Sequence, residues 1–463
     1  MGVVGRSMVS PARQAALSVL LAVERDGAYA NLELQKQTRR WKLKPSDSSL
    51  LTELVNGALR RQGTLDWVIE QFSTVSVSRM NRIILCIVRL GVYQLLYLDR
   101  IPARAACAEA VNQAKSRGLH GLAGFVNALL RGVSRNKRMI AYPDPEKETA
   151  LYLSLKNSHP LWIVERWLRR FGKEETIALC KADNEPPPVA LRCNTLRITP
   201  SRLAARLAAE GLTVRPSTLV PEGIIAGNLS FLPHLKSFQD GLYAVQDESS
   251  MIASSVLNPP PEAFVIDACS GPGGKTTHLA QLMKNKGRIL ALDVHEHRLK
   301  LVDDACRRLG VTIVETRRLD VRELPDQLRE KADYILVDAP CSGLGVIRRR
   351  PDLRWRMQPE QLSLHASQQL DILRGAAKCL KTGGLLLYST CSTEPEENRG
   401  VVNSFLMEYT GFKTEDLTTL LPFPLVYSSD MRDAGNGFLQ LLPHRHNTDG
   451  FFLSCLRKTK ESR

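Results

Sequence analysis

The chain has 463 residues, which exceeds one ordinary domain, and we expect two or three. Apolar residues make up 43% and charged residues 24%, as is typical of a globular protein with sizeable cores. Lys and Arg outnumber Asp and Glu by 63 to 48, and the net charge of +15 favours an anionic partner, with nucleic acid first.

The apolar runs and the cysteine spacing argue against a membrane protein, a secreted protein and a zinc-binding protein. No apolar run approaches membrane-spanning length, and the first residues lack a signal-peptide core, so we expect no membrane contact. The ten cysteines are scattered, without a C-x-x-C pair or a zinc-type spacing. We therefore expect a cytoplasmic protein with reduced thiols, no metal and a monomeric state.

Residues 1–141 form the first expected domain, an all-α bundle. Ser10 and Pro11 suit a helix start, and apolar residues recur at helical spacing over residues 83–96, 105–114 and 122–130. From Met1 to Ile140 there are 21 Lys and Arg against 9 Asp and Glu, a net of +12. Such a basic bundle can grip phosphates without reading sequence, although a solvated face kept for solubility is the alternative. Basic residues expected on its exposed faces are Arg39, Arg40, Arg60, Arg61, Arg82, Arg131, Arg135, Lys137 and Arg138.

Residues 142–240 form the second expected domain, a small α+β unit. The two prolines in residues 142–145 indicate a boundary. A Trp-containing helix over 161–170 follows, then strands over 189–194 and 212–215 around a helix over 200–210. The run 191–196 carries basic and amide side chains, and its residues alone leave RNA contact and a linker role equally open.

Residues 241–463 form the third expected domain, in which strands and helices alternate. Strands are predicted over 264–268, 288–292, 311–315, 334–337 and 385–388, with a final antiparallel strand over 449–456 at an edge. This alternation predicts a doubly wound, Rossmann-like α/β fold. Ligands of such sheets bind beyond the carboxyl ends of the strands.

The glycine-rich turn after the first of these strands fits neither phosphate-binding motif. A P-loop needs Gly where Cys269 stands, and a dinucleotide fingerprint needs its third Gly where Thr276 stands. A small-residue turn at a helix start, followed by Asp293 for a ribose and Asp320 for an adenine amine, suits a nucleoside without a diphosphate. S-adenosylmethionine is such a ligand, and the residues expected to bind it are Cys269, Ser270, Gly271, Pro272, Gly273, Gly274, Lys275, Asp293, Asp320 and Asp338.

Two cysteines each follow an apolar strand, in Asp338-Ala339-Pro340-Cys341 and Thr390-Cys391-Ser392. Neighbouring parallel strands would bring both thiols to one edge of the sheet, where they could face a single reacting molecule. The alternative is that both are small hydrophobic core residues, which is the usual role of a buried cysteine.

Together with the glycine-rich turn, these motifs resemble those of the RNA cytosine-5 methyltransferases. Within them, the whole chain resembles the RsmB (Sun/Fmu) family, which joins a NusB-like RNA-binding domain to a catalytic domain. Matching stretches are residues 125–131, 245–250, 348–355 and 394–398. The resemblance implies a SAM-dependent methyltransferase whose partner is 16S ribosomal RNA. One departure is Ser270-Gly271, where the family more often has two alanines.

The chemistry of cytosine explains why such a site needs a thiol. A thiolate that adds at C6 breaks the aromaticity of the ring and makes C5 able to take a methyl group. The resemblance implies that Cys391 is this nucleophile, that Cys341 assists product release and that Asp338 supports the base at N3. The residues alone do not order the two cysteines. Arg348, Arg349 and Arg350 are expected to line the RNA path, unless they form a solvated loop.

Two other functions remain open at this point. A transfer-RNA cytosine-5 methyltransferase would use the same chemistry, but it has no need of the basic N-terminal bundle. A non-catalytic RNA-binding assembly or antitermination factor would have no need of the intact Asp338, Cys341 and Cys391.

Overall fold

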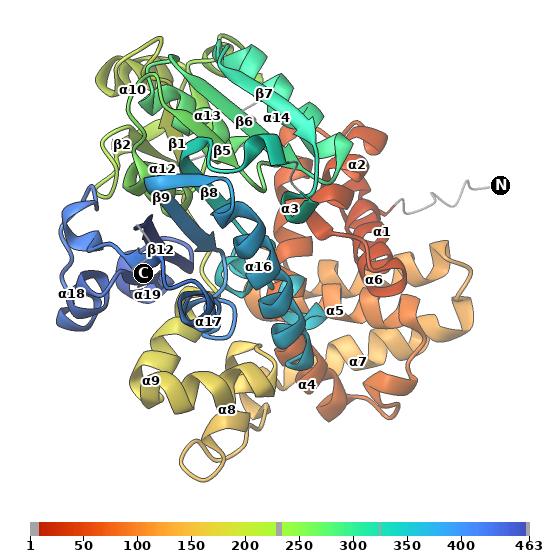
Figure 1. Ribbon diagram of the computed structural model, residues 1–463. Helices are drawn as coiled ribbons and strands as arrows, with labels where there is room; N and C mark the ends of the chain where they lie inside the picture. Colours follow the sequence, from red (N-terminus) through yellow and green to blue (C-terminus); the bar gives the residue numbers. More distant parts are fainter. Residues whose placement is uncertain (1–8, 228–233, 324–325, 460–463) are drawn as a thin grey trace. The chain divides into compact units, whose positions relative to one another are not determined.

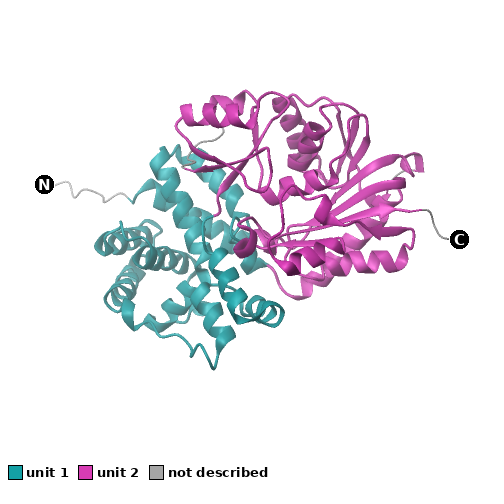
Figure 2. Ribbon diagram, turned by 90° about the vertical axis from the view of Figure 1, so that its left-hand side faces the viewer, with its two compact units in different colours: residues 1–186, 347–356 teal, residues 187–346, 357–463 magenta. Residues whose placement is uncertain are grey.

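The computed structural model describes residues 9–227, 234–323 and 326–459. The chain forms two compact units, one of Met1–Pro186 with Ile347–Arg356 and the other of Pro187–Val346 with Met357–Arg463 (Figure 2). The helices between residues 142 and 186 group with the first unit, whereas the strands from Val189 onward group with the second. The segment 142–240, expected as one domain, is thus shared between the two units.

The first unit is built from helices. Its elements are α1 (Pro11–Asp26), α2 (Ala30–Trp41), α3 (Pro45–Arg60), α4 (Gln62–Phe72), α5 (Arg82–Tyr97), α6 (Ala103–Ser116), α7 (Ala123–Arg135), α8 (Thr149–Asn157), α9 (Leu161–Ala182) and the short α15 (Leu353–Arg356). The helices predicted over 83–96, 105–114 and 122–130 correspond to α5, α6 and α7. Helix α9 consists of two helical segments that meet at Gly172, whose φ is 81°. The first corresponds to the helix predicted over 161–170, and the second was not predicted.

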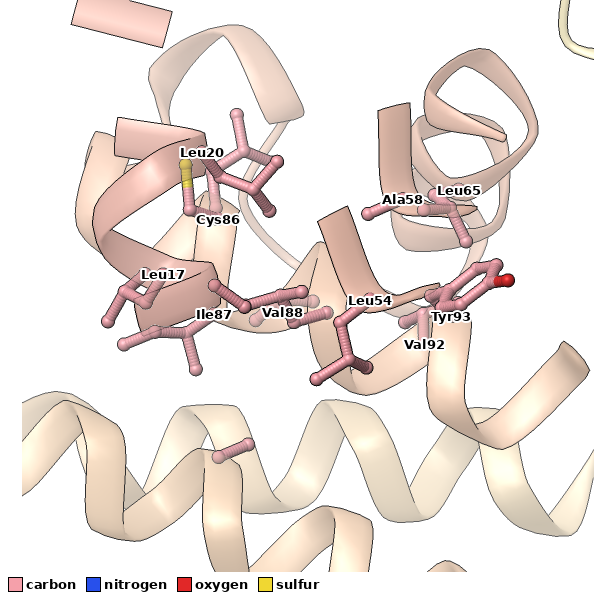
Figure 3. Packing of buried hydrophobic residues seen from close by; sticks show 14 of the residues in the cluster. Leu17, Leu20, Leu54, Ala58, Leu65, Cys86, Ile87, Val88, Val92 and Tyr93 are labelled. Carbon is pink, nitrogen blue, oxygen red and sulfur yellow. The ribbon is translucent and has the colours of Figure 1, made fainter. Parts of the chain in front are cut away.

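The bundle core forms around α5, which is apolar on nearly every side. Side chains of α1, α3 and α5 point into one shared interior (Figure 3). Helix α1 begins as predicted, because Ser10 accepts a hydrogen bond from the Arg13 backbone N–H and Pro11 occupies the first turn. The one buried cation of α5, Arg89, is neutralised by Asp66 at 2.7 Å and by Glu24 at 3.1 Å.

Most of the basic residues expected on exposed faces of the bundle are exposed, but Arg60 is not. Its side chain is buried, and its Nη2 donates to the carbonyl of Arg348 at 3.3 Å within the same unit. The prediction for Arg60 was wrong because this arginine lies on the packed face of α3, where periodicity alone does not separate it from its neighbour Arg61.

The second unit contains a small antiparallel sheet in the order β2-β3-β1-β4. Its strands are β1 (Val189–Cys193), β2 (Thr213–Pro216), β3 (Gly223–Gly227) and β4 (Tyr243–Val245), with helices α10 (Pro200–Ala209) and α11 (Lys236–Gln239). Arg192 on β1 is 1% exposed and donates to Gly274 O at 2.6 Å and Thr277 Oγ1 at 2.9 Å. Arg192 therefore braces the start of a helix of the large sheet, and its guanidinium does not face solvent.

The large sheet has the order β10-β12-β9-β8-β5-β6-β7, with β11 also paired to β12 (Figure 1). Strands β5 (Phe264–Asp267), β6 (Arg288–Asp293), β7 (Val314–Arg318), β8 (Ala332–Asp338) and β9 (Leu380–Thr390) are parallel. The chain runs outward through β6 and β7 and returns to β8 beside β5, so the topological switch point lies between β5 and β8.

The final strand, β12 (Phe451–Lys458), is antiparallel to β9, as predicted, but it is not at an edge. Strands β10 (Phe412–Thr414) and β11 (Phe438–Leu441) both pair with β12 and cover its far side. The edge prediction was wrong because these two short strands carry too few alternating residues to be recognised from the sequence.

Successive side chains along a strand of the large sheet pack in two separate cores, one on each face. Ile289 and Ala291 of β6 pack in one core, with helices α12 (Glu248–Leu257), α13 (Gly274–Leu282) and α14 (Glu296–Leu309). Leu290 and Leu292 pack in the other, with α16 (Glu360–Ala377) and α17 (Arg399–Glu408). Helices on both faces of a mostly parallel sheet confirm the doubly wound architecture. Among the described residues, no helix is both long and apolar enough to cross a membrane.

Candidate active site

Carboxylates gather where the parallel strands end. Strands β5, β6 and β8 end at Asp267, Asp293 and Asp338, and Asp320 follows β7. Burial, followed by the charges of these four aspartates, holds the pKa of the Cys269 thiol well above its ordinary value. All four carboxylates therefore lie around the loop that contains Cys269, as the sequence predicted for the carboxyl ends of a parallel sheet.

The glycine-rich loop connects β5 to α13 through a tight turn. The N–H of Gly273 donates to Ser270 O at 2.7 Å, and the N–H of Gly271 donates to Asp293 Oδ2 at 3.2 Å. Gly273 has a φ of 99°, in the left-handed region that favours glycine, and its Cα leads directly into α13. The loop thus brings its own backbone against the carboxylate at the end of β6.

Two buried polar atoms of this region have no partner among the described residues. Asp267 Oδ2 accepts from Thr276 Oγ1 at 2.6 Å, but Asp267 Oδ1 and Ser270 Oγ remain unpaired. Burial raises the pKa of Asp267 to about 7, with a further increase from Asp338 opposed by the Thr276 hydrogen bond. Unpaired buried polar atoms beside a small-residue turn fit a site that binds a polar ligand such as a nucleoside. Asp320 is also present, ion-paired with Arg322 at 2.6 Å.

Asp338 links the glycine-rich loop to the cysteine strands. Its Oδ2 accepts from Lys275 Nζ at 2.6 Å, and its Oδ1 accepts from Ser389 Oγ at 2.9 Å. Lys275 also lies over the ring of Phe451, with its nitrogen 5.1 Å from the centroid. The carboxylate partner of Lys275 is therefore Asp338 of the same site.

The two cysteines lie side by side, as the paired strands predicted. Cys341 Sγ and Cys391 Sγ are 3.3 Å apart, and both side chains are partly exposed. Apart from Cys269, the other cysteines of the described residues are buried. The adjacent Cys391 thiol, followed by burial, holds the pKa of Cys341 well above its ordinary value. A core role as small hydrophobic residues does not explain two partly exposed thiols in contact.

The backbone joins the two cysteine loops directly. The N–H of Gly345 donates to Cys391 O at 2.9 Å, and a Cβ at Gly345 would lie 2.0 Å from Gly450 O. Only glycine permits this close approach of three segments. The loop after Cys341 is thereby held against the loop that carries Cys391.

The sequence analysis missed a buried polar cluster beneath the cysteines. Glu397 accepts hydrogen bonds from Ser342 and Ser392, the residues that directly follow Cys341 and Cys391. The stretch 394–398 was noted for its family resemblance, without a role for any of its residues. No spacing rule could have supplied the contact with Ser342, because that residue and Glu397 are 55 residues apart in the chain.

The arginine run 348–350 lies in a different unit from the cysteines. Residues Ile347–Arg356 group with the helical unit, and Arg348 is 4% exposed. The Arg348 side chain is thus buried in the structure, whereas Arg350 is exposed and Arg349 is half-buried, and contact of this run with RNA stays a prediction. The segment is anchored by Arg354, which is fully buried and donates to Ser158 O at 2.8 Å. In the described ranges, no group of three or more His, Cys, Asp or Glu is placed to hold a metal.

Comparison with known proteins places each region in a family. The NusB family model matches residues 10–135, a ferredoxin-like domain model of RsmF/B-like methyltransferases matches 159–228, and the model of 16S rRNA methyltransferase RsmB/F matches 254–457. The predicted fold class, with a NusB-like bundle, a small α+β domain and a Rossmann-like methyltransferase domain, is confirmed.

Relatives of the whole chain agree with these matches. A probable ribosomal RNA small subunit methyltransferase B of Bacillus subtilis is 39% identical over 96% of this chain and 98% of its own length. The ribosomal RNA small subunit methyltransferase B of Proteus mirabilis is 32% identical over 92% of this chain and 93% of its own length. The crystal structure of PH0851 matches with a TM-score of 0.81 and 29% identity, covering 97% of this chain and 99% of that chain. That of NSun6 from Pyrococcus horikoshii with SFG has a TM-score of 0.57 and 29% identity, covering 64% of this chain and 97% of that chain. The chain belongs to the RsmB family of small-subunit ribosomal RNA methyltransferases.

Proposed function

We propose that this protein transfers a methyl group from S-adenosylmethionine to C5 of a specific cytosine in 16S ribosomal RNA, through a covalent adduct between Cys391 and C6. The observation that carries this proposal is the 3.3 Å approach of two partly exposed thiols at the sheet edge that also holds Asp338. A thiol nucleophile is needed because C5 of an aromatic, electron-poor ring does not attack a methyl group by itself.

The cofactor site in this proposal is the glycine-rich loop with the carboxylates around it. Its residues are Cys269, Ser270, Gly271, Pro272, Gly273, Gly274, Lys275, Asp293, Asp320 and Asp338. Bound S-adenosylmethionine supplies an electrophilic methyl group on a sulfonium. Two observations support the assignment: the unpaired polar atoms of Asp267 and Ser270, and a structure of the related NSun6 with SFG, an analogue of this cofactor.

In the first step, Cys391 acts as a thiolate and forms the bond to C6. The electron pair of the C5–C6 π bond moves into the ring toward N3. C5 would then bond to the methyl carbon while the carbon–sulfur bond of the sulfonium breaks, and the sulfur would keep that electron pair as a neutral thioether. We assign Asp338 to the hydrogen bond at N3 that supports this addition, since its carboxylate accepts from Lys275 of the loop and from Ser389, two residues before Cys391. Lys275 holds that carboxylate in place at 2.6 Å.

In the second step, the C5 proton leaves to water, the electron pair restores the C5–C6 bond, and Cys391 departs as a thiolate. Because its pKa is raised, Cys341 remains a thiol and can donate a hydrogen bond to the departing sulfur 3.3 Å away. The family resemblance assigns Cys391 as the nucleophile, and the raised pKa of Cys341 fits the residue that assists release.

We place substrate binding on the basic N-terminal domain, residues 1–141. We propose that residues 142–240 and 241–463 form the other two domains. Exposed arginines and lysines of α7 and its exit, such as Arg131, Arg135 and Arg138, can contact phosphates. Arg350 is the exposed member of the arginine run and remains a predicted RNA contact. The target cytosine must lie in a loop or leave its stack, because C6 is not reachable within a paired helix. We place the reaction in the cytoplasm, where thiols stay reduced.

The substrate assignment is tested by bisulfite mapping of ribosomal RNA from cells with and without this protein. We expect one cytosine of 16S ribosomal RNA to lose its 5-methyl group and to regain it when the wild-type protein is restored. An unchanged methylation pattern in 16S ribosomal RNA, with a lost position in transfer RNA, would transfer the proposal to that substrate.

A further inference from the structure

We propose that Glu397 is a positioning residue that sets the distance between the two active-site thiols. The proposal rests on the proposed function for its catalytic meaning, but the geometric claim concerns the protein alone. Glu397 lies at the start of α17, beneath the two cysteine loops, and is fully buried. A buried carboxylate is expensive unless each oxygen is hydrogen-bonded, so its partners indicate what it is for.

Both oxygens of Glu397 bind the cysteine loops. Oε1 accepts from the Ser342 backbone N–H at 2.8 Å, and Oε2 accepts from the Ser342 hydroxyl at 2.5 Å. Oε2 also accepts from the Ser392 hydroxyl, which itself lies 3.1 Å from the Ser342 hydroxyl. One carboxylate therefore holds the residue after Cys341 and the residue after Cys391 at the same time.

A second contact fixes the other side of the Cys341 loop. Gln369 of α16 is fully buried, and its side-chain amide donates to Glu397 Oε1 at 3.1 Å and to Pro340 O at 3.0 Å. Cys341 is thus held through Pro340 before it and Ser342 after it. The backbone carbonyl of Glu397 accepts from the Tyr388 hydroxyl at 2.6 Å, so the backbone that carries this side chain is fixed to β9 as well.

The neighbouring Asn398 shows why Glu397 is distinct. Its side-chain oxygen accepts from Thr390 Oγ1 at 2.5 Å, and its amide nitrogen donates to Ser392 O at 3.0 Å. Thr390 and Ser392 both belong to the Cys391 loop, whereas the Glu397 side chain reaches both loops. Loss of the Glu397 carboxylate should therefore change the separation of the thiols, which Asn398 cannot set.

The thiol separation can be measured without RNA, as the rate at which diamide converts the two thiols to a disulfide. Each thiol loses a proton and an electron, and diamide is reduced to the hydrazine. The Cys341–Cys391 peptide pair is then quantified by mass spectrometry after thiol blocking. The variants compared are Glu397→Ala, Glu397→Gln, Ser342→Ala and Ser392→Ala, with Glu222→Ala as the matched control.

We expect Glu397→Ala to slow disulfide formation by about 10-fold or more, because both loops lose their shared acceptor. Glu397→Gln should stay within about 3-fold of wild type, since an amide oxygen still accepts from the Ser342 N–H and its NH₂ group donates to the two hydroxyls. Glu222 is a buried glutamate that bonds to His278 at 2.6 Å, away from the cysteines, so its loss should leave the rate unchanged. Each single serine variant should slow closure by about 2- to 5-fold.

The two serine variants should affect catalysis in different ways. Ser342→Ala loosens the loop of Cys341, which assists release, and should accumulate RNA adduct. Ser392→Ala loosens the loop of Cys391, which attacks C6, and should slow adduct formation. A wild-type closure rate in folded Glu397→Ala overturns the proposal, and so does a Glu397→Gln variant that is as slow as Glu397→Ala. If Glu397→Ala does not fold, unchanged closure in both serine variants overturns it instead. Altered closure with no RNA adduct in any variant, including Cys341→Ala, would refute the covalent mechanism and leave the positioning role intact.

Discussion

The site has two halves that are built in different ways. The cofactor half consists of the ends of β5, β6 and β7 with the loop 269–275, and two of its carboxylates bond to side chains nearby in the sequence. Asp267 accepts from Thr276, nine residues away, and Asp320 from Arg322, two residues away. These contacts form wherever the local turn forms, so this half is specified by short motifs.

The thiol half consists of the ends of β8 and β9 with the loops that follow them. Here the two cysteines in contact are 50 residues apart in the sequence, and Ser342 and Glu397 are 55 apart. These contacts exist only when β8 and β9 pair in register and α17 packs beneath them. The comparison teaches that the cofactor half depends on local turn chemistry, whereas the thiol half depends on the assembled sheet.

Asp338 joins the two halves, and we expect its loss to have the largest effect. In Asp338→Asn, one carboxylate oxygen becomes an NH₂ group that cannot accept from Lys275 or Ser389. Methyl transfer should fall by about 100-fold or more, because the group that supports the base is displaced. Single-turnover transfer of labelled methyl groups to 16S ribosomal RNA measures this effect.

Asp333→Asn is the matched control for this prediction. Asp333 lies on the same strand, β8, and pairs with Lys381 at 2.7 Å, but it is not at the carboxyl end. Its loss should leave transfer within about 2-fold of wild type, as for other surface ion pairs. Equal activity of Asp338→Asn and Asp333→Asn would show that the two halves do not meet at Asp338.

Gly273→Ala should damage the cofactor half alone. Gly273 has a φ of 99°, and a Cβ there would lie 3.0 Å from Val302 Cα, so alanine forces the turn to shift. We expect S-adenosylmethionine to bind about 10-fold more weakly in calorimetry, a strain of about 1.4 kcal/mol. The rate of Cys341–Cys391 disulfide formation should not change.

Gly435→Ala serves as the control for that substitution, since a Cβ there would meet no atom within 4 Å in the described structure. It should bind the cofactor as the wild type does. If Gly273→Ala also slowed disulfide formation, the two halves would be coupled through the loop and the comparison would fail.

The difference between local and long-range contacts determines how much of each half could be predicted from the sequence. The strands, the glycine-rich turn, the acids at the strand ends and the two facing cysteines all depend on local patterns, and the structure brings them together. The role of Glu397 could not be predicted, because its partners come from three separate segments. The burial of Arg60 and Arg348 was missed for the same reason, since burial of a basic residue depends on tertiary neighbours.

The smallest effect we expect concerns the small sheet that braces the cofactor half. His278 of α13 is buried against Glu222, and burial lowers its pKa to about 4, opposed by the Glu222 hydrogen bond. The unfolded chain binds a proton near pH 6.5, so stability from this site is complete above pH 6.5 and is lost as the pH falls toward 4. Between pH 7 and pH 5, the free energy of unfolding in urea should fall by about 1–2 kcal/mol less for His278→Gln than for wild type.

His297→Gln, at an exposed position of α14, should retain the wild-type dependence on pH. An identical loss of stability in wild type and His278→Gln would show that this histidine is protonated in the folded protein. His278 would then form an ion pair with Glu222 in the folded protein.

The most direct test of the central claim compares Cys341→Ala with Cys391→Ala after incubation with 16S ribosomal RNA and S-adenosylmethionine. Denaturing gel electrophoresis detects a covalent RNA–protein adduct. We predict that Cys341→Ala accumulates the adduct, because Cys391 can attack but is released slowly, and that Cys391→Ala forms none and transfers no methyl group. Adduct formation by Cys391→Ala alone would reverse the two roles, and methyl transfer retained by Cys391→Ala would contradict covalent catalysis by this residue.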